Sequence, residues 1–210
     1  MSEQDKLEQA IAIQESMRGT IPDEVVDVAI TALRKQIAEL QPVQTNEQRK
    51  HLTLLHTGLS GFTAQTEQMD AEELSQVMSV YYDAVTPSIQ KYGGMIEKRL
   101  GDTVMAVFGL PQAHENDPEN SIRAALEMQQ ALVTLNERME NEWGFRLNMR
   151  VGISTGPVLA RTMGSGDERD FSVIGSTVNI VNRIEKITPD GGILISHDTF
   201  SKIELHRFGG

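Results

Sequence analysis

Several side chains of this protein are of types that bind cations or phosphates, and they lie beside glycines. Asp102 follows Gly101, and a carboxylate is a ligand that divalent cations accept. Gly61, Phe62 and Thr63 precede a predicted helix, and backbone N–H groups at helix starts favour anions. Taken alone, an aspartate after a glycine is equally typical of a solvated turn, so the surrounding pattern has to decide.

Two further pairs of polar residues have suggestive positions. Asn179 and Arg183 are four residues apart and therefore share one face of a predicted helix. This pair suits an anionic ligand, and it also suits hydrogen bonds to neighbouring loops. Lys98 and Ser172 fall in predicted strands, where each is also consistent with an ordinary exposed strand residue.

The composition indicates a globular protein with an acidic surface. Of the 210 residues, 39% are apolar and 23% charged, which favours one ordinary domain plus an appendage. The net charge of −11 argues against binding nucleic acid or an anionic membrane, since both need basic patches. The chain has no cysteine and no apolar run long enough to span a bilayer. We therefore expect a cytoplasmic protein in which any polyanion site is a local exception.

Residues 1–48 are expected to form a helical extension with a linker, and residues 49–205 a single domain. The extension has one helix near 6–17, which breaks near Gly19, and a second that ends at Pro42. The apolar positions of the second helix have coiled-coil spacing: Val26, Ile30, Leu33, Ile37 and Leu40. A helical hairpin packed on the domain or on a second copy is favoured over a long signalling coil, because few heptads are present.

Strands and helices alternate in the rest of the chain. The expected elements are a strand over 52–59, a helix over 70–91, a hairpin over 95–108, a helix over 117–141, a strand over 147–154, a hairpin over 158–174 that turns at 164–166, a helix over 177–186 and a strand over 192–196. The order is β-α-β-β-α-β with additions. It predicts an α+β fold, a ferredoxin-like sheet with helices on one face. The open face of such a sheet needs a cover, which favours a dimer.

Four segments of the domain together resemble the catalytic domain of the class III nucleotidyl cyclases, in a divergent form of the bacterial type. They are GLSGFT at 58–63, KRLGDTVMAVFG at 98–109, RVGISTGPV at 150–158 and VIGSTVNIVNR at 173–183. Each segment alone is a weak signal, but all four occur in order with matching spacing. The resemblance implies the fold of the family, whereas activity does not follow from fold alone.

The resemblance also implies how the metal and the phosphates are held. In the family, one aspartate at the end of the first strand and one at the hairpin tip bridge two Mg²⁺ ions. Asp102 matches the second of these aspartates. The backbone carbonyl of Leu59 matches a further metal ligand, and Gly61, Phe62 and Thr63 match the phosphate cradle.

Lys98 and Ser172 match the pair that reads the purine base in the family. A lysine donates and suits N1 of adenine, whereas N1–H of guanine requires an acceptor, and the serine hydroxyl can accept from N6. We therefore expect ATP rather than GTP. Asn179 and Arg183 match the catalytic pair that orients the ribose and neutralises charge on the α-phosphate in the transition state.

Gly58 stands where the family has the first metal aspartate, and it offers no side chain to a metal. His56 lies two residues earlier on the same face of the strand, but imidazole is a poor ligand for Mg²⁺, so we expect a partly buried histidine. Arg161 and Asn182 are larger and more polar than the family residues at these positions, so the pocket or the dimer seam is altered. The family's additional phosphate-binding lysine has no counterpart up to Gly210.

We therefore expect an ATP-binding cyclase domain with a degenerate metal site. It holds one Mg²⁺ or Mn²⁺ ion with ATP through Asp102 and the Leu59 carbonyl, has no or very weak cyclase activity, and acts as a nucleotide sensor or interaction module. The alternative is an active adenylyl cyclase that converts ATP to cyclic AMP and diphosphate with a compensated metal site. A purely structural dimerisation module is a third hypothesis, against which the retained site residues weigh. The resemblance further implies a homodimer with its sites at the interface.

Overall fold

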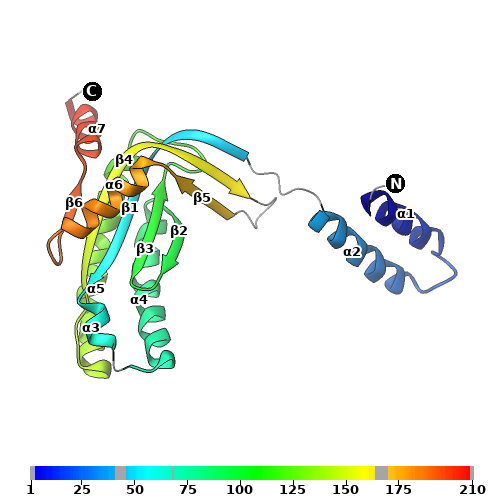
Figure 1. The fold of residues 1–210 in the computed structure, drawn as a ribbon, viewed down its shortest axis with the longest axis horizontal. Coiled ribbons are helices and arrows are strands. Elements are labelled where there is room, and N and C mark those ends of the chain that lie inside the picture. Colours follow the sequence, from blue (N-terminus) through cyan, green and yellow to red (C-terminus); the bar gives the residue numbers. More distant parts are fainter. Residues whose placement is uncertain (1–2, 41–45, 68, 164–169, 209–210) are drawn as a thin grey trace. The chain divides into compact units, whose positions relative to one another are not determined.

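The computed structural model describes residues 3–40, 46–67, 69–163 and 170–208 (Figure 1). The chain divides into two compact units, one of Met1–Asn46 with Met163–Asp170 and one of Glu47–Thr162 with Phe171–Gly210. The expected turn at 164–166 and residues 41–45 of the expected linker lie outside the described residues. Within the described parts of the chain, no helix has both the length and the apolar character needed to cross a bilayer.

The smaller unit contains the helical hairpin that the sequence predicts. Helix α1 (Glu3–Ser16) contacts α2 (Asp23–Leu40), and Val26 and Ile30 of α2 are buried. Arg18, between the helices, ties them together because its Nε donates to Oε2 of Glu15 at 2.6 Å and its Nη2 to Oδ1 of Asp27 at 2.7 Å. The coiled-coil spacing of α2 is therefore explained in part by packing between these two helices.

The larger unit is built on one sheet. Its strands are β1 (Asn46–Ser60), β2 (Met95–Leu100), β3 (Thr103–Phe108), β4 (Asn148–Met163), β5 (Asp170–Ile174) and β6 (Ile193–Ile195). The order across the sheet is β2-β3-β1-β4-β5, and β6 pairs with β4 in parallel. β3 lies antiparallel to both β1 and β2. This arrangement confirms the expected α+β ferredoxin-like fold.

Two long helices cover one face of the sheet, and they are α4 (Ala71–Lys91) and α5 (Asp117–Trp143). Asp70 caps α4, since its carboxylate accepts from the backbone N–H groups of Glu72 and Glu73. The core between helices and sheet includes Tyr81 and Met128, both fully buried. A short helix, α3 (Phe62–Thr66), follows β1 directly.

Helix α6 (Ser176–Ile187) packs against the opposite face of the sheet, where its Val181 joins a core with Leu54 of β1 and Met105 of β3. Gly152 of β4 lets the helix come close, because a Cβ there would lie 2.6 Å from the backbone nitrogen of Glu185. The final helix, α7 (His197–Phe208), follows β6. Neither α3 nor α7 is among the helices that the sequence patterns predict.

One expected break is wrong. We expected separate strands over 147–154 and 158–163, but β4 runs without interruption through Gly156-Pro157. Val151–Ile153 of β4 pair with β6, and β4 also lies between β1 and β5 in the order of the sheet. Gly156 packs beneath α6, where a Cβ would lie 2.7 Å from Oγ1 of Thr177. The glycine thus serves close packing and does not end the strand.

Candidate functional site

The end of β1 and the tip of the β2–β3 hairpin lie at the same end of the sheet. β1 pairs with β3 as far as Thr57 opposite Val104, and Gly58 follows directly. The hairpin turns at Gly101 and Asp102, where Gly101 has a φ of 54°, a left-handed conformation that glycine adopts readily. Asp102 and Gly58 therefore lie close together across the pairing of β1 with β3. This is the arrangement that the sequence motifs predict for a metal site.

The space beside Gly58 is filled by a side chain from α6. Residues of β1 alternate between the faces, so Leu55 and Leu59 point toward α4 and α5, and Gly58 lies toward α6. A Cβ on Gly58 would lie 2.4 Å from Oε1 of Glu185 and 2.9 Å from its Cδ. The Glu185 carboxylate therefore occupies volume that a side chain at position 58 would need.

Glu185 lies in a buried polar cluster with Arg150 of β4 and His56 of β1. It is only 4% exposed, although carboxylates are rarely so deeply buried without partners. Nη2 of Arg150 lies 3.1 Å from Oε1 of Glu185, and Nδ1 of His56 lies 3.8 Å from Oε2. The Arg150 contact has the distance of an ion pair without hydrogen-bond geometry. Among the described residues, Oε1 of Glu185 and Nδ1 of His56 have no hydrogen-bond partner.

The protonation of this cluster follows from its burial. Burial raises the pKa of Glu185; Arg150 opposes the rise, and the negative charge of Asp102 adds to it. Burial lowers the pKa of His56 to about 4, with help from the positive charges of Lys98 and Lys186. His56 is therefore neutral at pH 7, so its contact with Glu185 is not an ion pair there. It is mostly buried, as expected.

Lys98 and Ser172, the expected base-reading pair, are on strands that are not neighbours. Lys98 of β2 is opposite Met105 of β3, and Met105 is also opposite His56 of β1, so these three side chains share the face that α6 covers in part. Ser172 is half-buried on β5, and β3, β1 and β4 lie between β2 and β5. Nζ of Lys98 lies 3.7 Å from Oε2 of Glu97 and remains largely exposed.

Asn179 and Arg183 lie on the outer side of α6. Both are exposed, whereas Thr177, Val181 and Glu185, also spaced by four, are buried against the sheet. The helix thus points one polar pair to solvent and one carboxylate toward Gly58. Within one chain, the catalytic pair that the resemblance implies is directed away from the sheet face where Gly58 lies.

The loop after β1 supplies backbone groups beside this end of the sheet. The Leu59 side chain is buried, so its role rests on its carbonyl. Gly61 has a φ of 68° and precedes the five-residue helix α3, whose Phe62 side chain is buried. Gly61 and Thr63 are exposed. A helix this short gives only a small favourable dipole, so an anion here depends mainly on individual N–H groups.

The two enlarged residues have different surroundings. Nε of Arg161 donates to Oε1 of Glu47 at 2.6 Å, which joins β4 to the start of β1 on the surface. Oδ1 of Asn182 is buried without a hydrogen-bond partner among the described residues. Arg161 is therefore explained by a local ion pair, and nothing in the structure explains Asn182.

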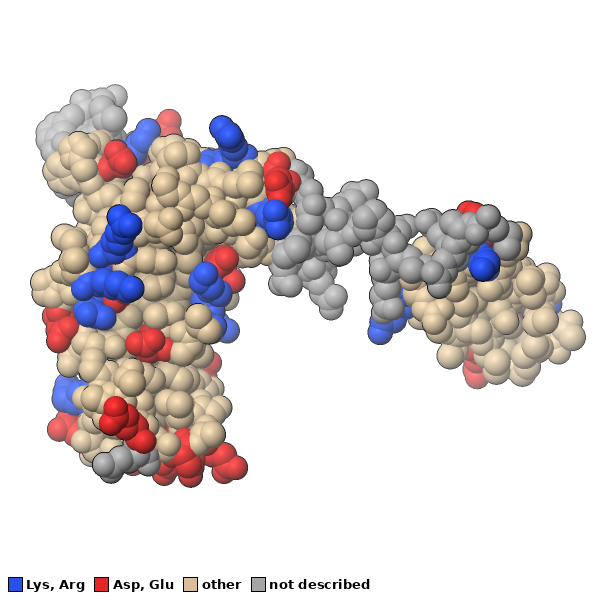
Figure 2. Space-filling view, viewed as in Figure 1, with Lys and Arg blue, Asp and Glu red and all other residues tan. Residues whose placement is uncertain are grey.

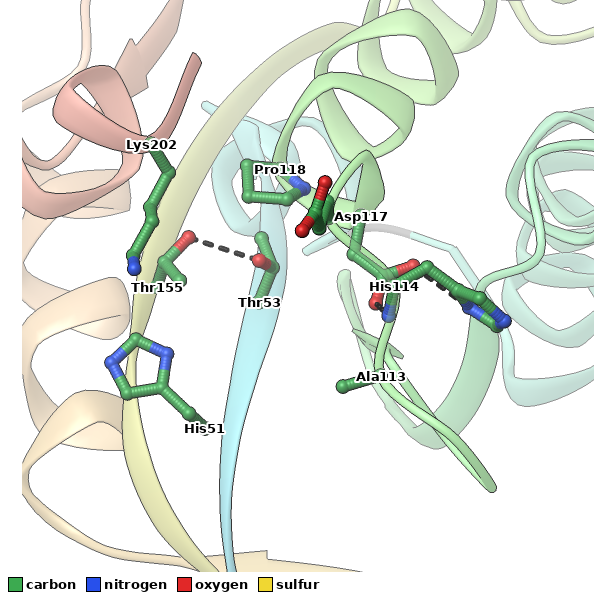
Figure 3. Close-up of a pocket in the computed structure, with 9 residues that line it drawn as sticks. His51, Thr53, Ala113, His114, Asp117, Pro118, Thr155 and Lys202 are labelled. Carbon is green, nitrogen blue, oxygen red and sulfur yellow. Dashed lines mark hydrogen bonds and ion pairs between the residues drawn. The ribbon is translucent and has the colours of Figure 1, made fainter. Parts of the chain in front are cut away.

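A separate cavity of about 440 Å³ lies elsewhere in the larger unit (Figure 3). His51, Thr53, Thr155 and Lys202 are among its lining, and Oγ1 of Thr53 and Oγ1 of Thr155 are hydrogen-bonded at 2.9 Å. None of the described residues that line it belongs to the expected nucleotide site. The cavity is therefore not the site that the sequence motifs indicate.

Basic side chains gather locally on this acidic protein. On the face of the larger unit in Figure 2, Lys and Arg residues lie over the middle, where Figure 1 shows α6, β1 and β2, and over the upper end, whereas Asp and Glu residues gather at the lower end. The gathering provides the local exception to the net charge of −11 that a polyphosphate would need.

A divalent cation fits this end of the sheet only in part. Among the described residues, no three His, Asp or Glu side chains are grouped so as to hold a metal ion by themselves. Asp102 and the buried Glu185, with its orphaned oxygen, provide two carboxylates, and Mg²⁺ often takes one or two carboxylates with substrate phosphates. Sequence reasoning missed Glu185, although its place on the inward face of α6, four residues after Val181, was a readable signal.

Comparison with known proteins identifies similar chains. The sequence model for the adenylate and guanylate cyclase catalytic domain matches residues 44–208. An adenylate cyclase of Anabaena cylindrica is 31% identical over 147 residues, which are 68% of this chain and 28% of that protein. Adenylate cyclase 1 of Rhizobium meliloti is 27% identical over 144 residues, 69% of this chain and 22% of that protein. The chain thus spans less than a third of the length of these relatives.

Two solved structures resemble the chain in fold and sequence. The adenylyl cyclase CyaB from P. aeruginosa is 32% identical with a TM-score of 0.69, covering 76% of this chain and 83% of that one. The guanylyl cyclase Cya2 is also 32% identical with a TM-score of 0.69, covering 74% and 79%. The similarity therefore extends over both adenylyl and guanylyl cyclases.

Proposed function

Because the chain belongs to the adenylate and guanylate cyclase catalytic domain family, that of the class III nucleotidyl cyclases, we propose that it binds ATP with a divalent cation and cyclises it very slowly or not at all. The observation that carries the proposal is Gly58 at the end of β1, beside a complete Asp102 hairpin. One metal ligand is absent from the strand while the other binding groups remain. The chain then acts as a nucleotide-responsive module.

The remaining groups favour retained binding. Asp102, the Leu59 carbonyl and the oxygens of ATP could hold one cation near the phosphates. When bound, that cation supplies charge neutralisation on the triphosphate. Lys98 is a donor and suits N1 of adenine, which favours ATP over GTP. Ser172, the expected partner for N6, lies on β5, and three strands separate it from β2 within one chain.

The missing ligand affects rate more than affinity. The 3′-hydroxyl is a poor nucleophile, and in the family a metal ion that the strand aspartate helps to hold would lower its pKa. Losing an interaction made mainly in the transition state reduces turnover and leaves ground-state binding largely intact. If that interaction contributes about 4 kcal/mol, turnover falls about a thousandfold.

A homodimer with shared sites is part of the proposal. Asn179 and Arg183 are exposed on the outer side of α6, so they are available to a nucleotide held by the Asp102 hairpin of a second copy. One copy then provides the metal ligands and the other provides the groups that orient the ribose and neutralise the α-phosphate.

A second candidate function is an active adenylyl cyclase with a compensated metal site. The position of Glu185 beside Gly58 favours it, because it returns a carboxylate to this end of the sheet. This candidate differs from the first in turnover, not in binding.

Calorimetric titration with Mg-ATP and Mg-GTP, with a cyclic AMP assay on the same sample, tests these functions. The proposal predicts ATP binding that is tighter than GTP binding and cyclic AMP formation near background. Cyclic AMP formation at a rate typical of enzymes, about 1–1000 per second, would establish the second candidate instead. Absence of binding at millimolar ATP would leave only a structural dimerisation module.

A further inference from the structure

A carboxylate oxygen of Glu185 lies within the space that a side chain at position 58 would enter. Oε1 of Glu185 is 2.4 Å from the Cβ position of residue 58. The oxygen reaches this space from α6, because Glu185 belongs to that helix. A carboxylate is therefore present beside the position at which β1 carries a glycine.

This carboxylate has one charged partner, Arg150, and fewer hydrogen bonds than burial demands. Buried carboxylates are normally satisfied by several hydrogen bonds, and an orphaned oxygen is costly. Oε1 of Glu185 has no hydrogen-bond partner among the described residues, and its contact with Nη2 of Arg150, at 3.1 Å, does not have hydrogen-bond geometry. Beside the Arg150 ion pair, Oε1 can therefore still bind a further positive group.

Asp102 provides the second carboxylate. Thr57 pairs with Val104, so the residue after Thr57 and the residue two before Val104 meet at the same end of the sheet. The Glu185 carboxylate contacts the Cβ position of Gly58, so both carboxylates lie at this end of the sheet. A cation between two carboxylates neutralises their mutual repulsion.

We infer that Glu185 supplies from α6 the carboxylate that β1 lacks, and that with Asp102 it holds a divalent cation when ATP is bound. The inference rests on the proposed ATP binding and deepens it by naming the second metal ligand. Two carboxylates are too few for a site without other ligands, so the cation binds well only together with nucleotide phosphates. Arg150 acts as a positioning residue that holds the Glu185 carboxylate beside Gly58.

The competing role for Glu185 is purely structural, as the buried partner of Arg150. The two roles differ in one measurable quantity, the gain in nucleotide affinity that a metal ion produces. A glutamate with a purely structural role affects folding and leaves this gain in affinity unchanged. A glutamate that binds the metal ion determines how large the gain in affinity is.

The test uses the full chain and 3′-deoxy-ATP, which lacks the nucleophilic hydroxyl and cannot be cyclised. Its dissociation constant is measured by calorimetry in Mn²⁺ and in EDTA. We expect Mn²⁺ to tighten binding to the wild type, and Glu185→Gln to lose about tenfold or more of that gain with unchanged affinity in EDTA. Glu127→Gln, which removes a surface carboxylate paired with Lys91, is the matched charge control and should keep the whole gain.

A carboxylate exchange separates ligation from folding. Glu185→Ala empties the space beside Gly58, and the double variant Gly58→Asp with Glu185→Ala returns a carboxylate from the strand. The single variant should lose the Mn²⁺ gain and the double variant should regain it, which a structural role for Glu185 does not predict. Melting temperatures of all variants, measured in EDTA, report whether each is folded.

The outcomes distinguish the two proposals. A full Mn²⁺ gain in Glu185→Gln, or wild-type affinity that is equal in Mn²⁺ and EDTA, overturns the metal role of Glu185 and leaves ATP binding established. No detectable binding of millimolar 3′-deoxy-ATP in either condition overturns the proposed function and the inference together.

Discussion

Oε1 of Glu185 lies 2.4 Å from the position that a Cβ of residue 58 would occupy, so Gly58 and Glu185 are complementary in shape. The glycine that removes a metal ligand from β1 is also what admits the buried carboxylate of α6. A substitution at either residue should therefore change the packing of the other.

Gly58→Ala should destabilise the fold by about 1–3 kcal/mol, because the new methyl group overpacks against the Glu185 carboxylate. Gly152→Ala is the matched comparison, since it is also buried beneath α6 but faces backbone atoms at 2.6 and 2.8 Å. A side chain can move aside more easily than a helix backbone, so Gly152→Ala should cost more. Urea unfolding of both variants measures the difference. Equal stability of Gly58→Ala and wild type would show that the space beside Gly58 is open.

Charge reversal at Lys98 should change base preference. Lys98→Glu replaces a hydrogen-bond donor by an acceptor. The affinity for ATP should therefore fall, and the affinity for GTP should rise relative to the affinity for ATP. Arg99→Glu is the control, because Arg99 is the next residue on β2 and bonds to Thr86 of α4, away from Lys98. The ratio of ATP affinity to GTP affinity is measured by calorimetry for each variant. A ratio that shifts equally in both variants would point to general electrostatics and not to base reading.

In the double variant Gly58→Asp with Glu185→Ala, for which we expect measurable turnover, Arg183→Ala should reduce cyclic AMP formation in Mn²⁺ by about 10²-fold while leaving the melting temperature unchanged, because the side chain is exposed. If sites are shared across a homodimer, mixing Arg183→Ala with Asp102→Asn, both in this background, should restore about a quarter of the activity of the double variant, since half of the dimers then carry one intact site. The control is each variant alone at the same total concentration. Mixtures no more active than the single variants, or a monomer in light scattering, would contradict the shared site.

His56 should make the metal-free fold less stable in mild acid. Its pKa is about 4 in the folded state and about 6.5 in the unfolded chain. The unfolded chain therefore takes up the proton first, and stability falls as the pH decreases from 6.5 toward 4, by about 3 kcal/mol at the acid end. Glu185 has the opposite effect on stability. Because its pKa is raised in the folded state, its contribution to stability falls as the pH rises above the ordinary pKa of a glutamate. The wild type minus His56→Gln difference in unfolding free energy isolates the histidine, and a pH-independent difference would refute its role.

The sequence predicted most of the fold because its signals are local. The apolar spacing and the Asp70 cap over 70–91 describe α4 well, and the glycines at 93–94 and 101 place the hairpin correctly. The break in β4 was predicted wrongly because Gly156 looks like a turn residue, whereas it permits close packing of Thr177. Helix α3 has only five residues and α7 lacks a clear apolar stripe, so neither has a strong signal.

The candidate site was predictable in its motifs but not in its contacts. Asp102, Asn179 and Arg183 were recognisable from their neighbours in the chain. The contact between Gly58 and Glu185 joins residues far apart in sequence, and nothing local to either residue specifies it. The distance between Lys98 and Ser172 across the sheet likewise depends on strand order, which residue types alone do not give.

The most direct test of the central claim, retained ATP binding with turnover limited at position 58, compares wild type with the double variant Gly58→Asp and Glu185→Ala at saturating Mg-ATP. A carboxylate fixed by the strand is not restrained by Arg150, so kcat for cyclic AMP should rise about tenfold or more while the affinity for ATP stays similar. An unchanged kcat in a folded, ATP-binding double variant, or a wild type that does not bind ATP, would contradict the claim.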